Sequence, residues 1–372
     1  MRGPASRPVV IAAGGTGGHF FPAEALAAEL VARGHRVALM TDARTGARRD
    51  GVFAGREQFV IAGAGIAGRG AVRGLRALAA LAAGAAQARA ILRRLDPAVV
   101  VGFGGYPSVA PVFGARLRRR PPPTLLHEQN AVLGRANRFL ATRADMLALG
   151  FADTARLPDG VRRVVTGNPV RGAIAALALQ RYTPPREGAL RLLVLGGSLG
   201  ARVFSDVVPA ALALLPSETR ARLAVVQQAR AEDVARTRAA YAESGIAAEL
   251  APFFPDVAER LAQAHLVIAR AGASTVAELA VAGRPAILVP LPIAIDDHQA
   301  ANARALAETG GAIAMRQTGF TPDALAEVLA SLLDDPARLA AMAAAARAQG
   351  RPQAAASLAD LVEAQMARVA RP

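Results

Sequence analysis

The chain has 372 residues, which is more than one ordinary hydrophobic core supports, so two domains are expected. It contains no cysteine, and all 44 of its basic residues are arginine. These absences exclude disulfide bonds, thiolate metal sites, a cysteine nucleophile, a P-loop lysine and Schiff-base chemistry.

The net charge of +15 lies almost entirely in the first half of the chain. Residues 1–170 hold 24 arginines against 10 acidic residues, whereas residues 171–372 hold 20 against 19. A basic half predicts a face that meets an anionic surface. Because aromatic residues make up only 4% and tryptophan is absent, a stacking platform for nucleic acid is disfavoured, and an anionic membrane is the better partner.

No segment has the length and regularity of a transmembrane helix. The longest uncharged run, residues 97–115, is interrupted by glycines and prolines. The apolar run at residues 9–13 is shorter than a signal peptide requires. We therefore expect a cytoplasmic protein.

A glycine-rich turn follows the first predicted strand. The strand spans residues 8–13, the turn GGTGGH spans residues 14–19, and a helix is expected over residues 22–32. Small residues and a helix start allow close approach of an anionic ligand. Phe20 stands where a dinucleotide fingerprint has its last glycine. His19 ends the turn, where its imidazole either caps and packs locally or serves as a base at the mouth of a cleft.

A second glycine-rich stretch, residues 62–76, precedes a long helix that ends at Leu95. Arg69, Arg73 and Arg76 lie at its start. Leucine and alanine recur at helical spacing, so one interpretation is an ordinary helix packed on the core. The other is that the first turns enter a lipid interface while the arginines reach the headgroups.

Two further strands of the first half end in polar residues. Residues 99–103 precede GGYPS, which contains Tyr106, and residues 124–126 precede HEQN at residues 127–130. HEQN is not a zinc-binding H-E-x-x-H motif, because Ala131 stands where the second histidine belongs. Four consecutive hydrogen-bonding side chains exceed what a turn requires, so they are expected in a site.

The second half of the chain repeats the architecture of the first. A composition change at residues 182–188 predicts a linker, and a strand at residues 192–195 then ends in GGSLGA, residues 196–201. Two halves that each begin with strand, glycine turn and helix predict two Rossmann-like domains facing each other across a cleft. The expected division is an N-terminal domain, a C-terminal domain and a final helix that packs back on the first domain, over residues 1–170, 171–350 and 351–372.

The second half also contains a strand–turn–helix unit suited to a nucleotide. The strand at residues 266–268 ends in a turn at residues 272–275, whose unpaired backbone N–H groups and helix dipole favour an anion. Glu278 follows Thr275 at the spacing of a capping box. Its alternative role is to accept hydrogen bonds from both hydroxyls of a ribose. A second strand then leads to the polar loop DDHQ at residues 296–299.

Taken together, seven stretches resemble the peptidoglycan glycosyltransferase family that adds N-acetylglucosamine to lipid I and so makes lipid II. They lie in family order between Gly14 and about Asn302, as GGTGGHFFPA, GFGGYPS, HEQNAVLGRANR, TGNPVR, GGSLGA, RAGASTVAEL and PAILVPLPIAIDDHQ. One glycine motif alone is weak, whereas the whole set is specific. The chain departs from the family pattern at Leu133, where proline is expected, and at Ser205, where asparagine is common.

The resemblance implies an α/β chain of the GT-B fold, in which two Rossmann-like domains with parallel sheets face each other across a deep cleft. It implies a peripheral enzyme on the cytoplasmic face of the inner membrane that uses UDP-N-acetylglucosamine and lipid I and needs no cofactor. The residues implied to hold the donor are Arg171, Ser198, Phe254, Ala273, Ser274, Thr275, Glu278 and Gln299. The residues implied to border the sugar and the acceptor from the other domain are Thr16, Gly17, Gly18 and Asn130.

The implied reaction is one inverting displacement, in which the C4 hydroxyl of a muramoyl residue attacks the sugar opposite the departing UDP. A base must take the hydroxyl proton, and an imidazole suits neutral pH. His19 is the first candidate, followed by Glu128 and Tyr106. Asp296 and Asp297 are adjacent carboxylates, which usually diverge, and the family dispenses with a metal, so a sugar contact is preferred to a metal site.

Alternatives from other classes remain open at this point. A glycolipid synthase of the same fold shares the donor motifs but lacks HEQN, and a UDP-N-acetylglucosamine epimerase uses a similar cleft without a lipid acceptor. An NAD-dependent oxidoreductase accounts for the first glycine turn and for Asp42 at the end of the second strand. The third glycine of the dinucleotide fingerprint, however, is missing from this chain. A membrane- or nucleic-acid-binding protein accounts for the charge and leaves the second half without a purpose.

Overall fold

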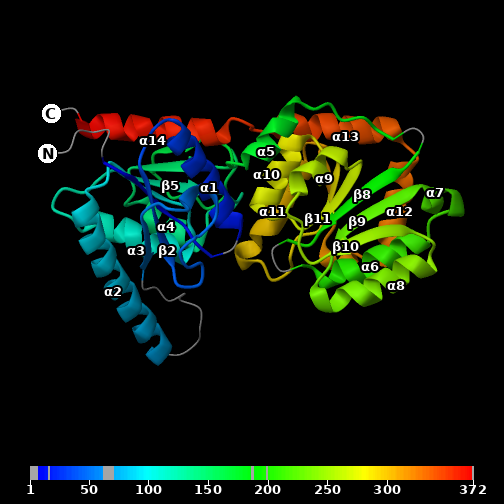
Figure 1. Ribbon diagram of the computed structural model, residues 1–372, viewed down its shortest axis with the longest axis horizontal. Helices are drawn as coiled ribbons and strands as arrows, with labels where there is room; N and C mark the ends of the chain where they lie inside the picture. Colours follow the sequence, from blue (N-terminus) through cyan, green and yellow to red (C-terminus); the bar gives the residue numbers. More distant parts are fainter. Residues whose placement is uncertain (1–6, 16, 62–70, 186–187, 198–199, 371–372) are drawn as a thin grey trace. The chain divides into compact units, whose positions relative to one another are not determined.

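The computed structural model describes residues 7–15, 17–61, 71–185, 188–197 and 200–370, with the backbone alone at residues 71–78 and 369–370 (Figure 1). The chain divides into two compact units. The first comprises Met1–Arg171 and Gln353–Pro372, and the second comprises Gly172–Pro352. Among the described residues, no helix is both long and apolar enough to cross a membrane.

The first unit is built around a parallel sheet. Within the described residues its strands follow the order β3-β2-β1-β4-β5-β6-β7. The central strands are buried on both faces, as is typical of parallel sheets covered by helices, which explains their continuous apolar runs. The strands are β1 Val9–Ala12, β2 Val37–Asp42, β3 Gln58–Ile61, β4 Val99–Gly102, β5 Thr124–Glu128, β6 Met146–Leu149 and β7 Arg163–Val165.

Helices cover both faces of this sheet (Figure 1). Side chains of α1 and α14 form one apolar cluster with the strands, and side chains of α2, α3 and α4 form another. The helices are α1 Gly17–Ala32, α2 Ala71–Leu95, α3 Gly105–Arg116, α4 Arg135–Ala141 and α14 Ala354–Ala370, with a 3-10 turn η2 at Gly51–Phe53.

The later turns of α2 are an ordinary part of the core. Ala88 and Leu92 are fully buried beneath the sheet. The helix also approaches α3 closely, because a Cβ at Gly114 would lie 2.7 Å from the carbonyl oxygen of Ala85. Core packing is therefore confirmed for these turns, whereas Arg69 and the side chains of Arg73 and Arg76 lie outside the described residues.

The final helix, α14, belongs to the first unit although the whole second unit precedes it in sequence. Its side chains Leu358, Ala359 and Val362 are fully buried. They join the same apolar cluster as Leu26 and Leu30 of α1. The final helix thus contributes directly to the core of the first unit.

The second unit contains another parallel sheet, with the strand order β10-β9-β8-β11-β12-β13 in its described part. The strands are β8 Leu190–Leu195, β9 Leu223–Gln228, β10 Ala247–Ala251, β11 Leu266–Ala269, β12 Ala286–Leu288 and β13 Ala312–Ala314. The α-helices are α5 Gly172–Ala175, α6 Arg202–Ala213, α7 Ser217–Arg222, α8 Val234–Glu243, α9 Val257–Gln263, α10 Ala273–Ala282, α11 His298–Ala307, α12 Pro322–Leu333 and α13 Pro336–Gln349. The 3-10 turns are η3 Ala176–Leu179, η4 Ala231–Asp233, η5 Ile295–Asp297 and η6 Gln317–Gly319.

Two parallel-sheet α/β units confirm the expected fold class, and two local predictions are wrong. α1 begins at Gly17 and contains Pro22, whereas the sequence pattern places the proline at the first helical position, where it is most common. Tyr182 does not lie in a linker. Its hydroxyl donates to the carbonyl oxygen of His265 at 2.9 Å, and burial raises its pKa, so this segment packs on the second unit.

Candidate functional site

The polar loops of the first unit gather at one edge of its sheet. β1, β4 and β5 are neighbouring parallel strands, so their carboxyl ends lie side by side. The elements that follow them carry His19 in α1, Tyr106 in α3 and Glu128 at the end of β5. Ligands of open α/β sheets bind at this edge. The topology thus brings together the three residues that the sequence proposes for catalysis.

A chain of hydrogen bonds runs from His19 into the core. Nδ1 of His19 lies 2.7 Å from Oε1 of Gln129, and Nε2 of Gln129 lies 3.0 Å from Nδ1 of His127. Nε2 of His127 lies 3.0 Å from the carbonyl oxygen of Gly167. The ring of His19 also lies against Gly105, where a Cβ would stand 3.6 Å from its Cδ2 atom and the backbone has a φ of +64°. A glycine at this position adopts that φ without strain.

His127 is completely buried, and burial lowers the pKa of its imidazole to about 4. The hydrogen bond to Gly167 and the charge of Glu128 oppose this change, and the nearby His19 adds to it. At neutral pH the His127 ring is therefore uncharged. It can accept a hydrogen bond at Nδ1 while it donates one from Nε2.

Glu128 is buried, and its carboxylate accepts four hydrogen bonds from the loop that follows. Oε1 accepts from the backbone N–H and the side-chain amide of Asn130, each at 3.0 Å. Oε2 accepts from the backbone N–H of Gly134 and the amide of Asn137, each at 2.9 Å. A carboxylate offers about four acceptor positions, so these bonds use its capacity. This geometry favours a role in shaping the loop that positions Asn130.

Tyr106 and Asp42 both accept hydrogen bonds at the same edge of the sheet. The Tyr106 hydroxyl accepts a hydrogen bond from Nε of Arg44 at 2.7 Å, and the guanidinium lies 4.7 Å from the centre of the tyrosine ring. Asp42 is buried and accepts from the backbone N–H of Thr45 at 3.1 Å. The Thr45 hydroxyl in turn accepts from the backbone N–H of Gly15 at 2.7 Å. Asp42 therefore holds the first glycine turn, which removes its use as the ribose-binding acid of a dinucleotide site.

In the second unit the glycine turn after β8 forms a hydrogen bond with a side chain of the neighbouring strand β9. The backbone N–H of Gly196 donates to Oε1 of Gln228 at 3.2 Å. A Cβ at Gly196 would collide with the backbone nitrogen of Ala201. Gly197 and Gly200 have φ values of +80° and +68°, which favour glycine. The backbone path thus favours glycine at positions 196, 197 and 200.

The turn after β11 opens α10, which begins one turn earlier than a capping box requires. Gly272 is the N-cap, and its carbonyl oxygen accepts the first helical bond, from Val276 at 3.0 Å. Thr275 is therefore inside the helix, and the predicted capping box with Glu278 is wrong. The backbone N–H groups of Ala273 and Ser274 lie in the first turn, where an anion is favoured. Glu278 follows in the second turn and is buried.

Arg270 joins this turn to the next strand. Its Nη1 donates to the carbonyl oxygen of Val289 at 3.1 Å, and its Nη2 donates to Oε1 of Gln317 at 2.7 Å. Burial lowers the pKa of its guanidinium, and the nearby positive charge of Arg230 lowers it further. Two arginines that repel each other at the carboxyl edge of a sheet create a local positive field, which an anion would relieve.

The remaining predicted donor residues are Phe254 and Gln299 in the second unit and Arg171, which ends the first unit. Phe254 is buried beneath the guanidinium of Arg260, which lies 4.1 Å from the ring centre. Gln299 accepts from the backbone N–H of Leu291 at 3.0 Å through Oε1. Arg171 is the last residue of the first unit, and its guanidinium lies 5.2 Å from the ring centre of Phe21.

Asp297, the second residue of the acidic pair, forms an ion pair within the second unit. Asp297 pairs with Arg316 through both carboxylate oxygens, at 3.1 and 2.8 Å. Asp296 and Asp297 both have positive φ values, of 56° and 53°. Across the described residues, no group of three or more histidine, cysteine, aspartate or glutamate side chains is arranged to hold a metal ion.

The predicted site residues of the two glycine turns are only partly described. Thr16 and Ser198 lie outside the described residues, and Gly17 and Gly18 form the first turn of α1.

The two departures from the family pattern are both buried, since Leu133 is fully buried and Ser205 is 4% exposed. A hydrophobic side chain is therefore accommodated at position 133 without exposure.

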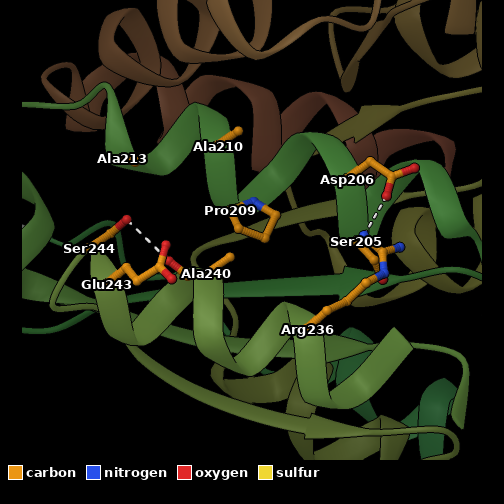
Figure 2. A pocket seen from close by; sticks show the side chains of 9 residues that line it. All are labelled: Ser205, Asp206, Pro209, Ala210, Ala213, Arg236, Ala240, Glu243 and Ser244. Atoms are coloured by element: carbon orange, nitrogen blue, oxygen red, sulfur yellow. Dashed lines mark hydrogen bonds and ion pairs between the residues drawn. The ribbon is translucent and has the colours of Figure 1, made fainter. Parts of the chain in front are cut away.

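A cavity of about 400 Å³ lies between α6 and α8 of the second unit (Figure 2). Arg236 crosses it and pairs with Asp206 at 2.6 Å and with Asp233 at 2.7 Å. The Oγ atom of Ser205 is buried there without a hydrogen-bond partner. None of the motifs singled out in the sequence supplies its lining, so we assign no ligand to it.

Gln129 belongs to the HEQN stretch that is expected in a site, whereas the sequence assigns no role to Asn137 or Arg270. Gln129 contacts His19, Asn137 contacts Glu128, and Arg270 connects the α10 turn to the following loop. The position of Gln129 within HEQN was a usable signal. Asn137 lies in the family-like stretch HEQNAVLGRANR, but nothing in the sequence predicts its hydrogen bond to Glu128.

Comparison with known proteins gives consistent matches over almost the whole chain. Residues 9–148 match the glycosyltransferase family 28 N-terminal domain, and residues 191–358 match the family 28 C-terminal domain. The chain is 62% identical to the "UDP-N-acetylglucosamine--N-acetylmuramyl-(pentapeptide) pyrophosphoryl-undecaprenol N-acetylglucosamine transferase" of Granulibacter bethesdensis, over 97% of this chain and 94% of that protein. It is 58% identical to the protein of the same name from Acidiphilium cryptum, over 97% and 98%.

A solved structure supports the same relationship. The crystal structure of Acinetobacter baumannii MurG superposes with a TM-score of 0.78 at 33% sequence identity, covering 96% of this chain and 99% of that one. The similarity in sequence and the similarity in backbone thus extend through both units.

Proposed function

The chain belongs to the family of N-acetylmuramyl-(pentapeptide) pyrophosphoryl-undecaprenol N-acetylglucosamine transferases, and from this premise we propose how its two units divide the reaction. It has the GT-B fold and is a glycosyltransferase that moves N-acetylglucosamine from UDP-N-acetylglucosamine to lipid I, forming lipid II in peptidoglycan synthesis. The first unit takes the acceptor and the second unit takes the donor.

His19 is the proposed base. The observation that carries this proposal is the 2.7 Å hydrogen bond between its Nδ1 atom and Gln129, which leaves Nε2 as the position for proton transfer. The C4 hydroxyl of the muramoyl residue gives its proton to Nε2 while its oxygen attacks the anomeric carbon opposite UDP, so the product has inverted configuration. Glu128 is already engaged by four donors, and Tyr106 accepts from Arg44, so both are weaker candidates.

The donor is proposed to bind along the carboxyl edge of the second sheet. The first turn of α10 presents backbone N–H groups at Ala273, Ser274 and Thr275, which favour the diphosphate. Glu278 supplies carboxylate oxygens for the ribose hydroxyls, and Gln299 holds the neighbouring loop.

Departure of UDP leaves negative charge on its phosphate. Preorganised N–H groups and fixed cations stabilise that charge without reorganising during the reaction. We propose Arg171 as one such cation and Ser198 as a further donor contact. Thr16, Gly17, Gly18 and Asn130 are proposed to border the sugar and the acceptor. Phe254 is covered by Arg260, so only its backbone is proposed to reach the donor.

The first unit is also proposed to meet an anionic membrane, as expected for a peripheral protein at the cytoplasmic face of the inner membrane. Leu117 and Phe139 are apolar side chains that are 49% and 46% exposed at the ends of α3 and α4. Arg143 lies 4.8 Å over the Phe139 ring, and Arg119 and Arg120 are exposed nearby in sequence. Apolar and basic side chains together suit a lipid headgroup region.

A transfer assay tests the proposed division of roles. The purified chain should move labelled N-acetylglucosamine from UDP-N-acetylglucosamine to a soluble lipid I analogue. His19→Ala should lower kcat by roughly 10²–10⁴-fold with little change in donor KM, because a base acts on turnover. A His19→Ala variant with near-parental kcat removes His19 from the role. Release of UDP at the same rate without acceptor would instead point to an epimerase or hydrolase.

A further inference from the structure

The side chain of Gln129 has one orientation that its surroundings allow. Its Nε2 atom lies 3.1 Å from the carbonyl oxygen of His127 and 3.0 Å from Nδ1 of the same residue. A backbone carbonyl oxygen can only accept a hydrogen bond, so the amide atom that faces it must be the NH₂ group. The amide oxygen of Gln129 consequently faces His19.

This orientation decides which nitrogen of His19 carries a hydrogen. Oε1 of Gln129 can only accept, so Nδ1 of His19, 2.7 Å away, must be the donor. In a neutral imidazole the other nitrogen then holds the lone pair. Nε2 of His19 is therefore the basic atom before the reaction begins.

His127 completes the arrangement with the opposite tautomer. Its Nδ1 accepts from Gln129, and its Nε2–H donates to the carbonyl oxygen of Gly167. Because burial keeps the pKa of this imidazole well below neutral, Nδ1 remains an acceptor at the pH of catalysis. The hydrogen bonds thus run in one direction: His19 donates to Gln129, Gln129 donates to His127, and His127 donates to the carbonyl oxygen of Gly167.

We propose that Gln129 is a positioning residue, which holds His19 in the Nδ1–H tautomer so that Nε2 is available as the base. This inference rests on the proposed function for its catalytic meaning, while the tautomer itself is a property of the free protein. When Nε2 takes the acceptor proton, the imidazolium keeps its Nδ1–H bond to Gln129. The amide oxygen then stabilises the new positive charge. The lone pair on Nδ1 of His127 accepts a hydrogen bond from the amide N–H group of Gln129, which strengthens the bond at the amide oxygen.

Nuclear magnetic resonance of the unliganded chain labelled with ¹⁵N-histidine tests the tautomer directly. The chain has five histidines, so few ring signals need assignment, and His19→Ala identifies that of His19. At neutral pH His19 should show a protonated Nδ1 and an unprotonated Nε2, and His127 should show the reverse. In Gln129→Met the Nε2–H form of His19 should gain population. A His19 ring that carries its hydrogen on Nε2 in the parent, or that is unchanged in Gln129→Met, overturns the proposal.

Kinetics distinguishes positioning from a structural role. Gln129→Met should lower kcat by about 10-fold, the worth of one hydrogen bond, with donor KM unchanged. Placed in the His19→Ala background, the same substitution should cost nothing further, because Gln129 acts through His19. An equal loss in both backgrounds contradicts the proposal.

Gln58 provides a matched control in the same unit. Like Gln129 it makes three hydrogen bonds, in its case with the backbone of Arg48 and of Phe53. Gln58→Met should therefore remove as many hydrogen bonds while leaving kcat near that of the parent. A comparable loss of kcat in this control would assign the effect to general destabilisation. If the parent itself transfers no sugar, the proposed function fails while the resonance experiment still decides the tautomer.

Discussion

Nη1 of Arg33 lies 2.6 Å from Oδ1 of Asp360, so the end of α1 is tied to α14 across 327 residues of sequence. The same nitrogen lies 2.9 Å from Oε2 of Glu363, and Nε2 of His35 lies 2.7 Å from Oε1 of that residue. These groups are partly solvent-exposed, and exposed ion pairs contribute little. They fix the register of the two helices, whereas the buried apolar side chains of α14 supply most of the stability.

Leu358→Ala should destabilise the first unit by about 2–4 kcal/mol, because it removes a fully buried side chain and leaves a cavity. Urea unfolding measures the change. Asp360→Ala, on the exposed side of the same helix, should cost less than about 1 kcal/mol. UDP affinity should be unchanged in both variants, because none of the proposed donor contacts lies on α14. Equal costs for the two variants would contradict the packing described for α14.

His127 should make the stability of the first unit depend on pH. Its folded pKa of about 4 lies below the ordinary value of 6.5, so between these values the unfolded chain binds a proton that the folded chain does not. The contribution of His127 to stability is therefore constant above pH 6.5 and falls as the pH drops toward 4, by at most about 3 kcal/mol. Unfolding free energies of the parent and of His127→Asn, compared at pH 7 and pH 5, should converge at the lower pH. Parallel curves would show that this ring is not buried in neutral form.

Glu128→Gln should weaken the loop more than it changes proton transfer. An amide NH₂ group would face donors that now meet a carboxylate oxygen, which costs about 1–3 kcal/mol of stability. The exposed Glu57, which pairs with Arg36 at 2.8 Å, offers a control, and Glu57→Gln should change little. Unchanged unfolding of Glu128→Gln together with a kcat loss of roughly 10²-fold or more would make Glu128 the base instead.

Glu278→Ala should weaken donor binding. Glu278 does not cap α10, whose N-cap is Gly272, and its proposed role is to accept hydrogen bonds from the ribose hydroxyls. Loss of a charged hydrogen-bond acceptor predicts about 1–3 kcal/mol of lost affinity for UDP, measured by calorimetry. Glu327→Ala removes an equal charge from the exposed side of α12 in the same unit and should leave affinity unchanged. Undiminished UDP binding in Glu278→Ala would place the ribose elsewhere.

Binding to anionic vesicles should depend on the arginines beside Phe139 and Leu117. Replacement of Arg119, Arg120 and Arg143 with glutamine should reduce binding by about 1 kcal/mol for each charge, and the loss should shrink as salt rises. Activity on a soluble short-chain acceptor should survive. The matched control replaces three exposed arginines of the second unit, Arg181, Arg238 and Arg351. If both triple variants lose binding equally, net charge and not this surface governs attachment.

The sequence by itself determined the fold class and the family, because both are written in short local patterns. Apolar runs that end in glycine turns and lead into helices require only neighbouring residues to be recognised. The strand before GGTGGH and the strand before GGSLGA are found as β1 and β8. Short strands with mixed composition, such as β3 and β13, carry too little pattern to be identified.

Only the tertiary structure decided what the polar residues do. Whether Glu128 faces a substrate or four donors of its own loop depends on where Gly134 and Asn137 lie after folding. The direction of the Gln129 amide is set by a carbonyl and two imidazoles brought together from α1 and β5. Hydrogen bonds have direction and reach only about 3 Å, so their partners follow from the packing of distant segments and not from spacing along the chain.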